Sequence, residues 1–376
     1  MKALLIILLF FYSCSSMNRK GELPVLTPFD ASSTMDITDV IDSVIYIQLD
    51  DTLLLRGLGN QVCTADFIFG TSQYGILMFD RDGHFVRKIG NIGEGPEDYH
   101  EYSYRLAVDI ENEIIYVLND PYDVLLSYSF TGDFLQRISL HFMDIIKEYN
   151  FPLFFRMQKD RLFLYYGCHK GLVGEKPLYW LSMTPDGRLI EFRRGNKNKI
   201  TDNKGWAFFD YFTSVDDSTM LYWDYYNDTV FHVAPSRAKA AFLWGQGDFR
   251  LQDTDDFTNI PQERMRCSNI LDTKNFLLLD WAPMSHYTGN NYFNLYDKRT
   301  GKTYRLQEDM IYDKRGDDLS IRYSNINYAR IEGREYILTQ TKSFNVEKIP
   351  GALHKKLDAD DLEGNPVIVM IRLKEQ

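Results

Sequence analysis

The sequence predicts an all-β protein, a six-bladed β-propeller with about four antiparallel strands in each blade. Three observations lead to this fold class. Short β-branched and aromatic runs cut by turn residues fill most of the chain, and Phe, Tyr and Trp make up 15% of it. Turns recur at Gly83, Gly132, Gly187, Ser236 and Gly301, at intervals of 49 to 65 residues, which suits propeller blades. Finally, strands near the two ends of the chain lack hairpin partners of their own.

The first residues are typical of a bacterial lipoprotein signal. Lys2 is followed by an apolar run from Ala3 to Tyr12 and then by Ser13-Cys14-Ser15-Ser16. The run is shorter than the ~20 residues that span a bilayer. We expect residues 1–13 to be removed, Cys14 to be acylated and residues 14–28 to form a tether. The alternative is an ordinary signal peptide with a chance cysteine.

Each recurring turn joins two predicted strands. The five hairpins comprise residues 74–79 and 84–89, 125–130 and 134–138, 179–183 and 188–192, 229–233 and 240–243, and 292–297 and 302–306. A further strand pair precedes the hairpin where it is clearest, at residues 105–109 and 113–118 and at 154–157 and 161–166. Five hairpins therefore predict five four-stranded blades.

The ends of the chain complete a sixth blade. We expect the strand at 43–49 to pair with strands at 335–339 and 366–373, because this closes the ring and covers both open edges. Helical patterns are limited to 142–148 and the acidic stretch 253–265. No linker divides the rest, so residues 29–376 form one predicted domain.

Four segments of the chain form a recognisable pattern: 44–49, 77–83, the Gly-Pro loop at 89–99 and the ending at 364–369. In these segments the chain resembles the six-bladed propeller lipoproteins of Bacteroides and related bacteria, a family without an established biochemical role. The resemblance implies a propeller over nearly the whole mature chain and a place in the cell envelope, on the outer membrane. Residues 15–22 lack a run of acids, which favours the periplasmic side over the cell surface.

Charge and cysteine content exclude several classes of partner. Without Lys2 the mature chain holds 41 basic and 53 acidic residues, a net charge of −12. This argues against nucleic acid and against electrostatic docking on anionic lipid, so membrane attachment would come from the lipid anchor. No C-x-x-C occurs, and we expect Cys63, Cys168 and Cys267 to be buried apolar residues. We expect a monomer without cofactors.

The loop from Gly90 to Tyr99 has two interpretations. It fails as a dinucleotide fingerprint, because Asp98 stands where the third glycine is required. We interpret it as a structural turn in which Gly93 and Gly95 take positive φ. The alternative is a ligand-contacting loop, in which Glu94 is the candidate residue.

Metal and catalytic motifs are absent from the sequence pattern. Residues 80–83 and 358–361 lack the rest of an EF-hand loop, and the seven histidines form no metal-binding motif. No G-x-S-x-G or S-x-x-K occurs. Residues from several blades could still form a metal site in a propeller channel, a possibility that the sequence leaves open.

Aromatic residues next to acids are the one enriched feature. They could stack a sugar and hydrogen-bond its hydroxyls, and the alternative is packing between blades. The candidates are Trp206, Tyr222, Trp223, Tyr226 and Trp281.

Two functions remain open on the sequence alone. The first is a non-catalytic envelope lipoprotein that binds an envelope protein or a glycan through one propeller face. The second is a carbohydrate-active enzyme, a glycoside hydrolase or lyase, with carboxylates at the central channel. Converging Asp/Glu pairs with raised pKa values would favour the enzyme.

Overall fold

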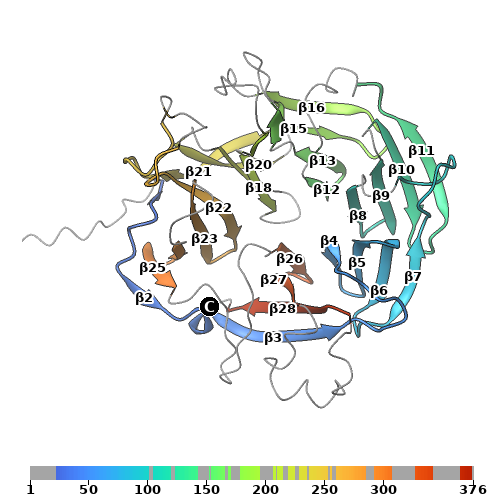
Figure 1. Cartoon of the computed structure of the whole chain (residues 1–376), viewed down its shortest axis with the longest axis horizontal. Helices are drawn as coiled ribbons and strands as arrows, with labels where there is room; N and C mark the ends of the chain where they lie inside the picture. The colour runs from blue at the N-terminus through green and yellow to red at the C-terminus, as the bar shows by residue number, and fades with distance from the viewer. Residues whose placement is uncertain are drawn as a thin grey trace, which may run out of the picture.

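The computed structural model is a ring of six four-stranded antiparallel sheets, a six-bladed β-propeller (Figure 1). This confirms the predicted fold class. The structure describes residues 23–100, 105–119, 123–142, 152, 154–165, 168–170, 178–194, 206–208, 210–214, 219–224, 228–234, 237–252, 255, 260–284, 292–306, 327–341 and 365–374.

The first three blades follow one another along the chain, each numbered here from its innermost strand outward. Blade 1 consists of β4 (Gly59–Cys63), β5 (Phe67–Ser72), β6 (Gly75–Asp80) and β7 (Phe85–Ile89). Blade 2 consists of β8 (Arg105–Asp109), β9 (Ile114–Asn119), β10 (Val124–Ser129) and β11 (Phe134–Ser139). Blade 3 consists of β12 (Phe154–Gln158), β13 (Arg161–Tyr165), β15 (Leu178–Met183) and β16 (Leu189–Arg194).

The remaining blades complete the ring, and a separate strand pair, β14 (Cys168–Lys170) with β17 (Trp206–Phe208), lies outside them. Blade 4 consists of β18 (Asp210–Ser214), β19 (Met220–Asp224), β20 (Thr229–Ala234) and β21 (Arg237–Trp244). Blade 5 consists of β22 (Met265–Asp272), β23 (Phe276–Pro283), β24 (Tyr292–Asp297) and β25 (Lys302–Leu306). Blade 6 consists of β26 (Asn327–Ile331), β27 (Arg334–Thr341), β28 (Val367–Leu373) and β3 (Ile41–Gln48).

The five predicted hairpins are confirmed as the two outer strands of blades 1 to 5. Four of their turns contain a glycine at positive φ, the conformation that glycine adopts without a steric penalty: Gly83, Gly132, Gly187 and Gly301. The turn chemistry that predicted the repeat therefore also explains why each hairpin reverses where it does.

The predicted ring closure is confirmed. The N-terminal strand β3 pairs antiparallel with the C-terminal strand β28, from Gln48 opposite Val367 to Ile41 opposite Leu373. The two strands lie side by side in Figure 1. Arg372 of β28 also forms an ion pair with Asp42 of β3.

A buried asparagine strengthens this closure. Asn365, which is 1% exposed, accepts a hydrogen bond from the Leu55 amide at 2.6 Å and donates one to the Leu53 carbonyl at 2.7 Å. The backbone N–H of Asn365 donates to Asp51 Oδ1 at 3.1 Å. The start of the C-terminal strand is therefore bonded to the loop that leads into blade 1.

The N-terminal segment is part of the propeller from Val25 onward, which corrects the tether that we expected over residues 14–28. β1 (Val25–Leu26) adds a parallel strand to β21, and Leu26 is buried. β2 (Ser33–Met35) does the same on β25. The chain thus runs along the outer edges of blades 4 and 5 before it enters blade 6, with one turn of 3-10 helix, η1 (Ile37–Asp39), on the way.

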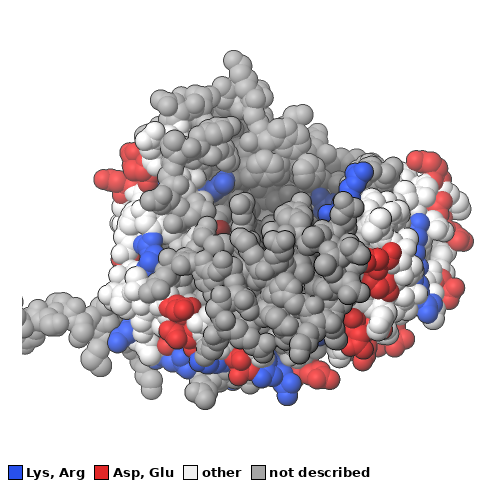
Figure 2. Space-filling view, turned by 60° about the horizontal axis from the view of Figure 1, so that its bottom comes forward, with Lys and Arg blue, Asp and Glu red and all other residues white. Residues whose placement is uncertain are grey.

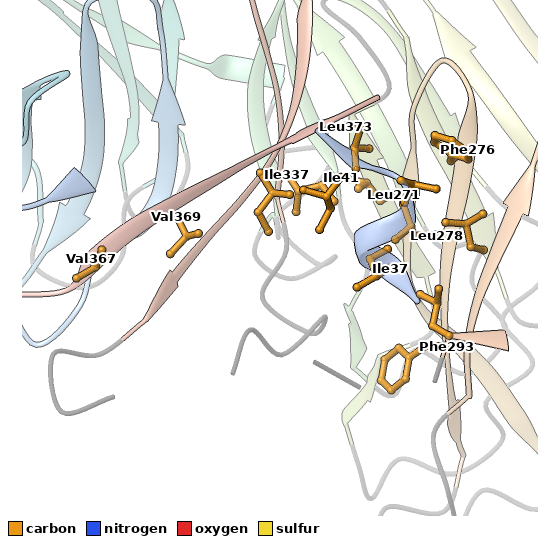
Figure 3. Packing of buried hydrophobic residues seen from close by; sticks show 14 residues of the cluster. Ile37, Ile41, Leu271, Phe276, Leu278, Phe293, Ile337, Val367, Val369 and Leu373 are labelled. Carbon is orange, nitrogen blue, oxygen red and sulfur yellow. The ribbon is translucent and has the colours of Figure 1, made fainter. Parts of the chain in front are cut away.

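The hydrophobic core is divided among the blade interfaces. The buried apolar residues of the described chain form six clusters, one between each pair of neighbouring blades. Figure 3 shows the cluster between blades 5 and 6, where Phe276, Leu278 and Phe293 face Ile337 and Val369. Each sheet therefore buries both of its faces, which explains the high aromatic content.

The other predictions have mixed outcomes. Cys63 and Cys267 are buried free thiols as expected, whereas nothing can be said of the side chain of Cys168. The first helical pattern, 142–148, lies almost wholly outside the described residues. In the second, residues 260–265 form a turn that leads into β22.

Candidate functional site

The innermost strands of the six blades surround the axis of the ring. They are β4, β8, β12, β18, β22 and β26, and each lies at one edge of its sheet (Figure 1). β8 contacts both β4 and β12, β4 also contacts β26, and β18 contacts β22 and approaches β26 across the ring. The channel that they line is therefore narrow, and side chains from different blades can meet in it.

Blade 3 contributes a cation to this channel. Phe155 and Met157 of β12 pack in the cluster toward blade 2, so Arg156 and Gln158 point from the opposite face of the strand. Burial lowers the pKa of the Arg156 guanidinium from its ordinary value, and the charge of Arg156 acts on Cys63. Cys63 belongs to blade 1, with β8 of blade 2 in between, so the charge of Arg156 acts on a group two blades away.

The Cys63 thiol is neutral. It is 5% exposed, and burial raises its pKa to about 12, although the charges of Arg81 and Arg156 act in the opposite direction. Burial likewise holds the pKa of Cys267 well above its usual range. Neither thiol can act as a nucleophile at neutral pH, because the thiolate is the reactive form.

Blade 5 contributes a carboxyl group and a second arginine. Asp280 of β23 is 6% exposed, and burial raises its pKa to about 6, while hydrogen bonding to Ser268 and the charge of Arg266 oppose the rise. Asp280 Oδ1 and Arg266 Nε are both buried without a hydrogen-bond partner. A small cavity lined in part by Asn269 and Phe293 adjoins Asp280.

The space-filling view shows a hollow toward the middle of one face of the ring, with Lys or Arg side chains of described residues beside it (Figure 2).

The described residues include no group of three His, Cys, Asp or Glu that could hold a metal ion. They also include no helix long and apolar enough to cross a membrane. Among the described residues of the innermost strands, Gln61, Gln158 and Arg266 hold buried polar atoms without a hydrogen-bond partner.

The described aromatic candidates lie between blades. Trp223 is 1% exposed and donates a hydrogen bond from Nε1 to the Cys267 carbonyl at 3.2 Å. Trp281 is 2% exposed, and its ring lies 4.9 Å from that of Trp244 in an edge-on arrangement. Tyr222 is buried with its ring stacked near Phe231. These three residues fit the packing alternative rather than an exposed surface for sugar stacking.

The other sequence candidates are Glu94, Trp206, Tyr226 and Cys14. The side chain of Glu94 is 93% exposed, and its Oε2 lies 3.6 Å from His100 Nε2. Trp206 lies in β17, but its side chain is not described, and Tyr226 and Cys14 lie outside the described residues. Of the described candidates, Trp223 and Trp281 share the cluster between blades 4 and 5, and Glu94 lies on the exposed loop after β7.

The loop after β7 is tightly bonded, in a different way from the expected one. The glycine at positive φ is Gly90, not Gly93 or Gly95. Gly93 and Gly95 instead make room for Asp98, since an added Cβ would lie 2.4 Å and 2.7 Å from Asp98 Oδ2. The buried Tyr99 hydroxyl donates to the Ile89 carbonyl at 2.8 Å.

Sequence reasoning missed Arg156, Arg266 and Asp280. A signal was present, because each is a single charged residue inside an apolar strand: Phe-Phe-Arg-Met, Met-Arg-Cys and Leu-Leu-Asp-Trp. Charged residues are seldom buried unless they are paired or functional, so a single charge inside an apolar strand marks a candidate functional residue.

Two solved structures have a similar fold. A Bacteroides fragilis protein designated as exported is 15% identical, with a TM-score of 0.65, covering 93% of this chain and 100% of its own. A DUF4221-family protein from Bacteroides vulgatus is 12% identical, with a TM-score of 0.51, covering 89% of this chain and 97% of its own. At these identities the likeness concerns the fold.

No curated protein matches the sequence. A family model does match, over residues 21–372, which include every blade and the N-terminal segment along blades 4 and 5. The chain therefore belongs to the family described as a domain of unknown function, DUF4934.

Proposed function

We propose that this protein is an exported, lipid-anchored propeller that binds a ligand or an envelope partner without catalysing a reaction. The observation that carries the binding role is the set of buried polar atoms without hydrogen-bond partners on the inner strands, on Gln61, Gln158 and Arg266. Buried polar groups are normally hydrogen-bonded, so a channel lined with open ones suits a bound polar molecule.

Export and anchoring are supported by the signal-like start of the sequence, and a fold neighbour is designated as exported. Attachment to the outer membrane through Cys14, with the periplasmic side favoured, is part of the proposal. So is a monomeric state, because the sixth blade is completed within one chain by the pairing of β3 with β28.

The enzyme alternative has less support. A glycoside hydrolase of the usual type uses two carboxyl groups, roughly 5–9.5 Å apart. Asp280 has the raised pKa of about 6 that such a role would need. However, the charged group of the described inner strands that shifts the pKa of Asp280 is the Arg266 guanidinium rather than a second carboxylate.

The test is isolation of the full-length protein from the envelope of a Bacteroides host. We expect the wild type in the membrane fraction, with a lipid-modified Cys14 at its N-terminus by mass spectrometry, and Cys14→Ala in the soluble fraction. Native mass spectrometry of the isolated protein should detect a bound species. A wild-type protein that is soluble and carries no ligand or partner would contradict the proposal.

A further inference from the structure

Arg156 is a partly buried cation without a counterion in the described chain. No hydrogen bond or ion pair from its guanidinium to a described residue is present, and its pKa is lowered by burial. Several other arginines of the described chain have a counterion: Arg372 pairs with Asp42, Arg264 with Asp255 and Arg299 with Asp297. An uncompensated charge away from bulk water is costly, so a partner of opposite charge is expected.

Gln158 provides a second and independent observation. It is 3% exposed, and both Nε2 and Oε1 are buried without a hydrogen-bond partner. Because it follows Arg156 by two residues in β12, its side chain lies on the same face of the strand. A buried amide that leaves its donors and its acceptor free, next to an unpaired arginine, is the pattern of a ligand-binding site without its ligand.

Among the described residues, the groups that act on Arg156 do not supply the missing negative charge. Cys63, on which Arg156 acts across the channel, is a neutral thiol because burial raises its pKa to about 12. Arg81 acts on the same thiol, and its Nη1 is also buried without a partner. The potential around Cys63 is therefore positive, although the protein as a whole is acidic.

We infer that the channel binds an oxyanion, a carboxylate or phosphate group, held by the Arg156 guanidinium and the Gln158 side-chain amide. This inference deepens the proposed function and rests on it, since it names the chemical class of the ligand. The planar guanidinium matches two oxygens of such a group, and the amide adds one donor and one acceptor for a neighbouring hydroxyl. The arginine fixes the charge of the ligand, and the glutamine contributes to its orientation.

The test compares thermal unfolding of the mature chain, made soluble by Cys14→Ser, in chloride, inorganic phosphate and malate at equal ionic strength. We expect phosphate, malate or both to raise the Tm of the wild type, and the responding anion identifies the phosphate or carboxylate class. Arg156→Met should lose the response. Arg237→Met, which changes an exposed arginine of β21, should keep it.

A second readout separates binding from a purely structural role. In chloride, Arg156→Met should unfold at the same temperature as the wild type or higher, because the substitution removes an unpaired charge and retains apolar volume. Gln158→Leu should likewise lose anion response without losing stability. A lower Tm of Arg156→Met in chloride, or an equal anion response in wild type and Arg156→Met, would overturn the inference.

Native mass spectrometry distinguishes this failure from failure of the proposed function. If wild type and Arg156→Met isolated from the envelope carry the same ligand in equal amounts, the protein binds a ligand but not through Arg156. If the wild type carries a ligand that Arg156→Met lacks, both proposals are supported.

Discussion

Ring closure by β3 can be tested with two substitutions in that strand. Ile45 and Ile47 have identical side chains on the same face of β3, but Ile47 is 4% exposed and Ile45 is 38% exposed. Ile47 packs in the cluster between blades 6 and 1, with Ile368 and Met370 of β28. Ile47→Ala removes three buried carbons, worth roughly 2.4 kcal/mol at about 0.8 kcal/mol each.

The cavity that remains adds to this cost, so the free energy of unfolding should fall by about 2–5 kcal/mol. Ile45→Ala should cost about 1 kcal/mol or less, because its side chain keeps much of its contact with water. Urea unfolding followed by tryptophan fluorescence measures both, with an unchanged m-value as the check that the same transition is observed. Equal losses from the two substitutions would refute the account of closure, because a frayed N-terminal strand would bury neither residue.

Three further changes test the loop, the closure and the channel. Gly90→Ala should lower the free energy of unfolding by about 1–3 kcal/mol, measured by thermal unfolding, because φ is +60° and the new Cβ would lie 2.7 Å from the Tyr128 ring. Gly95→Ala should lower it less, because its new Cβ would meet only the movable carboxylate of Asp98. Equal costs would contradict this assignment. Asn365→Ala should lower the unfolding free energy by on the order of 2–3 kcal/mol through loss of its buried hydrogen bonds, and a loss below about 0.5 kcal/mol would argue against its role in closure. Because burial raises the pKa of Asp280 to about 6, the folded protein retains a proton between pH ~4 and ~6 that the unfolded chain releases, so the stability contributed by this group falls as pH rises through that window. Asp280→Asn should remove this pH-dependent loss of stability, which amounts to at most on the order of 3 kcal/mol. If urea unfolding gives the variant and the wild type the same difference in unfolding free energy between pH 4 and pH 7, burial of the Asp280 carboxyl is contradicted.

The fold could be predicted because its signals are local. Hairpin turns such as the one at Gly83 require a particular backbone conformation, and the flanking apolar runs mark the strands whichever blade they join. Ring closure could be predicted because the strand at 43–49 has no hairpin partner next to it in the sequence, which leaves the unpaired C-terminal strands as its partners. The parallel strand at Val25 escaped prediction because two residues against a blade edge carry no periodicity.

The channel could not be predicted, because its residues meet only when the ring closes. Cys63 and Arg156 belong to blades 1 and 3, and nothing in either segment indicates that the charge of Arg156 acts on the Cys63 thiol. The burial of Trp223 and Trp281 could not be predicted for a related reason. A tryptophan next to an acid, as in Asp280-Trp281, has the same local pattern whether its ring is exposed or fills a blade interface.

The Gly-Pro loop lies between these two cases. Its composition indicated a tight structural turn, and the buried Tyr99 hydroxyl bonded to Ile89 agrees with that interpretation. The residue that needs the special backbone was misplaced, because a cluster of three glycines does not show which one takes positive φ. Asp98, which explains the other two, is recognisable only in the folded loop.

A crystal structure of the mature protein grown with selenate tests the central claim most directly. Selenate carries the oxygens of an oxyanion and an anomalous scatterer that locates it without ambiguity. The account places selenate in the channel, with oxygens about 2.7–3.2 Å from the Arg156 guanidinium and the Gln158 amide. An Arg156 guanidinium paired with a carboxylate of the chain itself, with selenate absent from the channel, would contradict it.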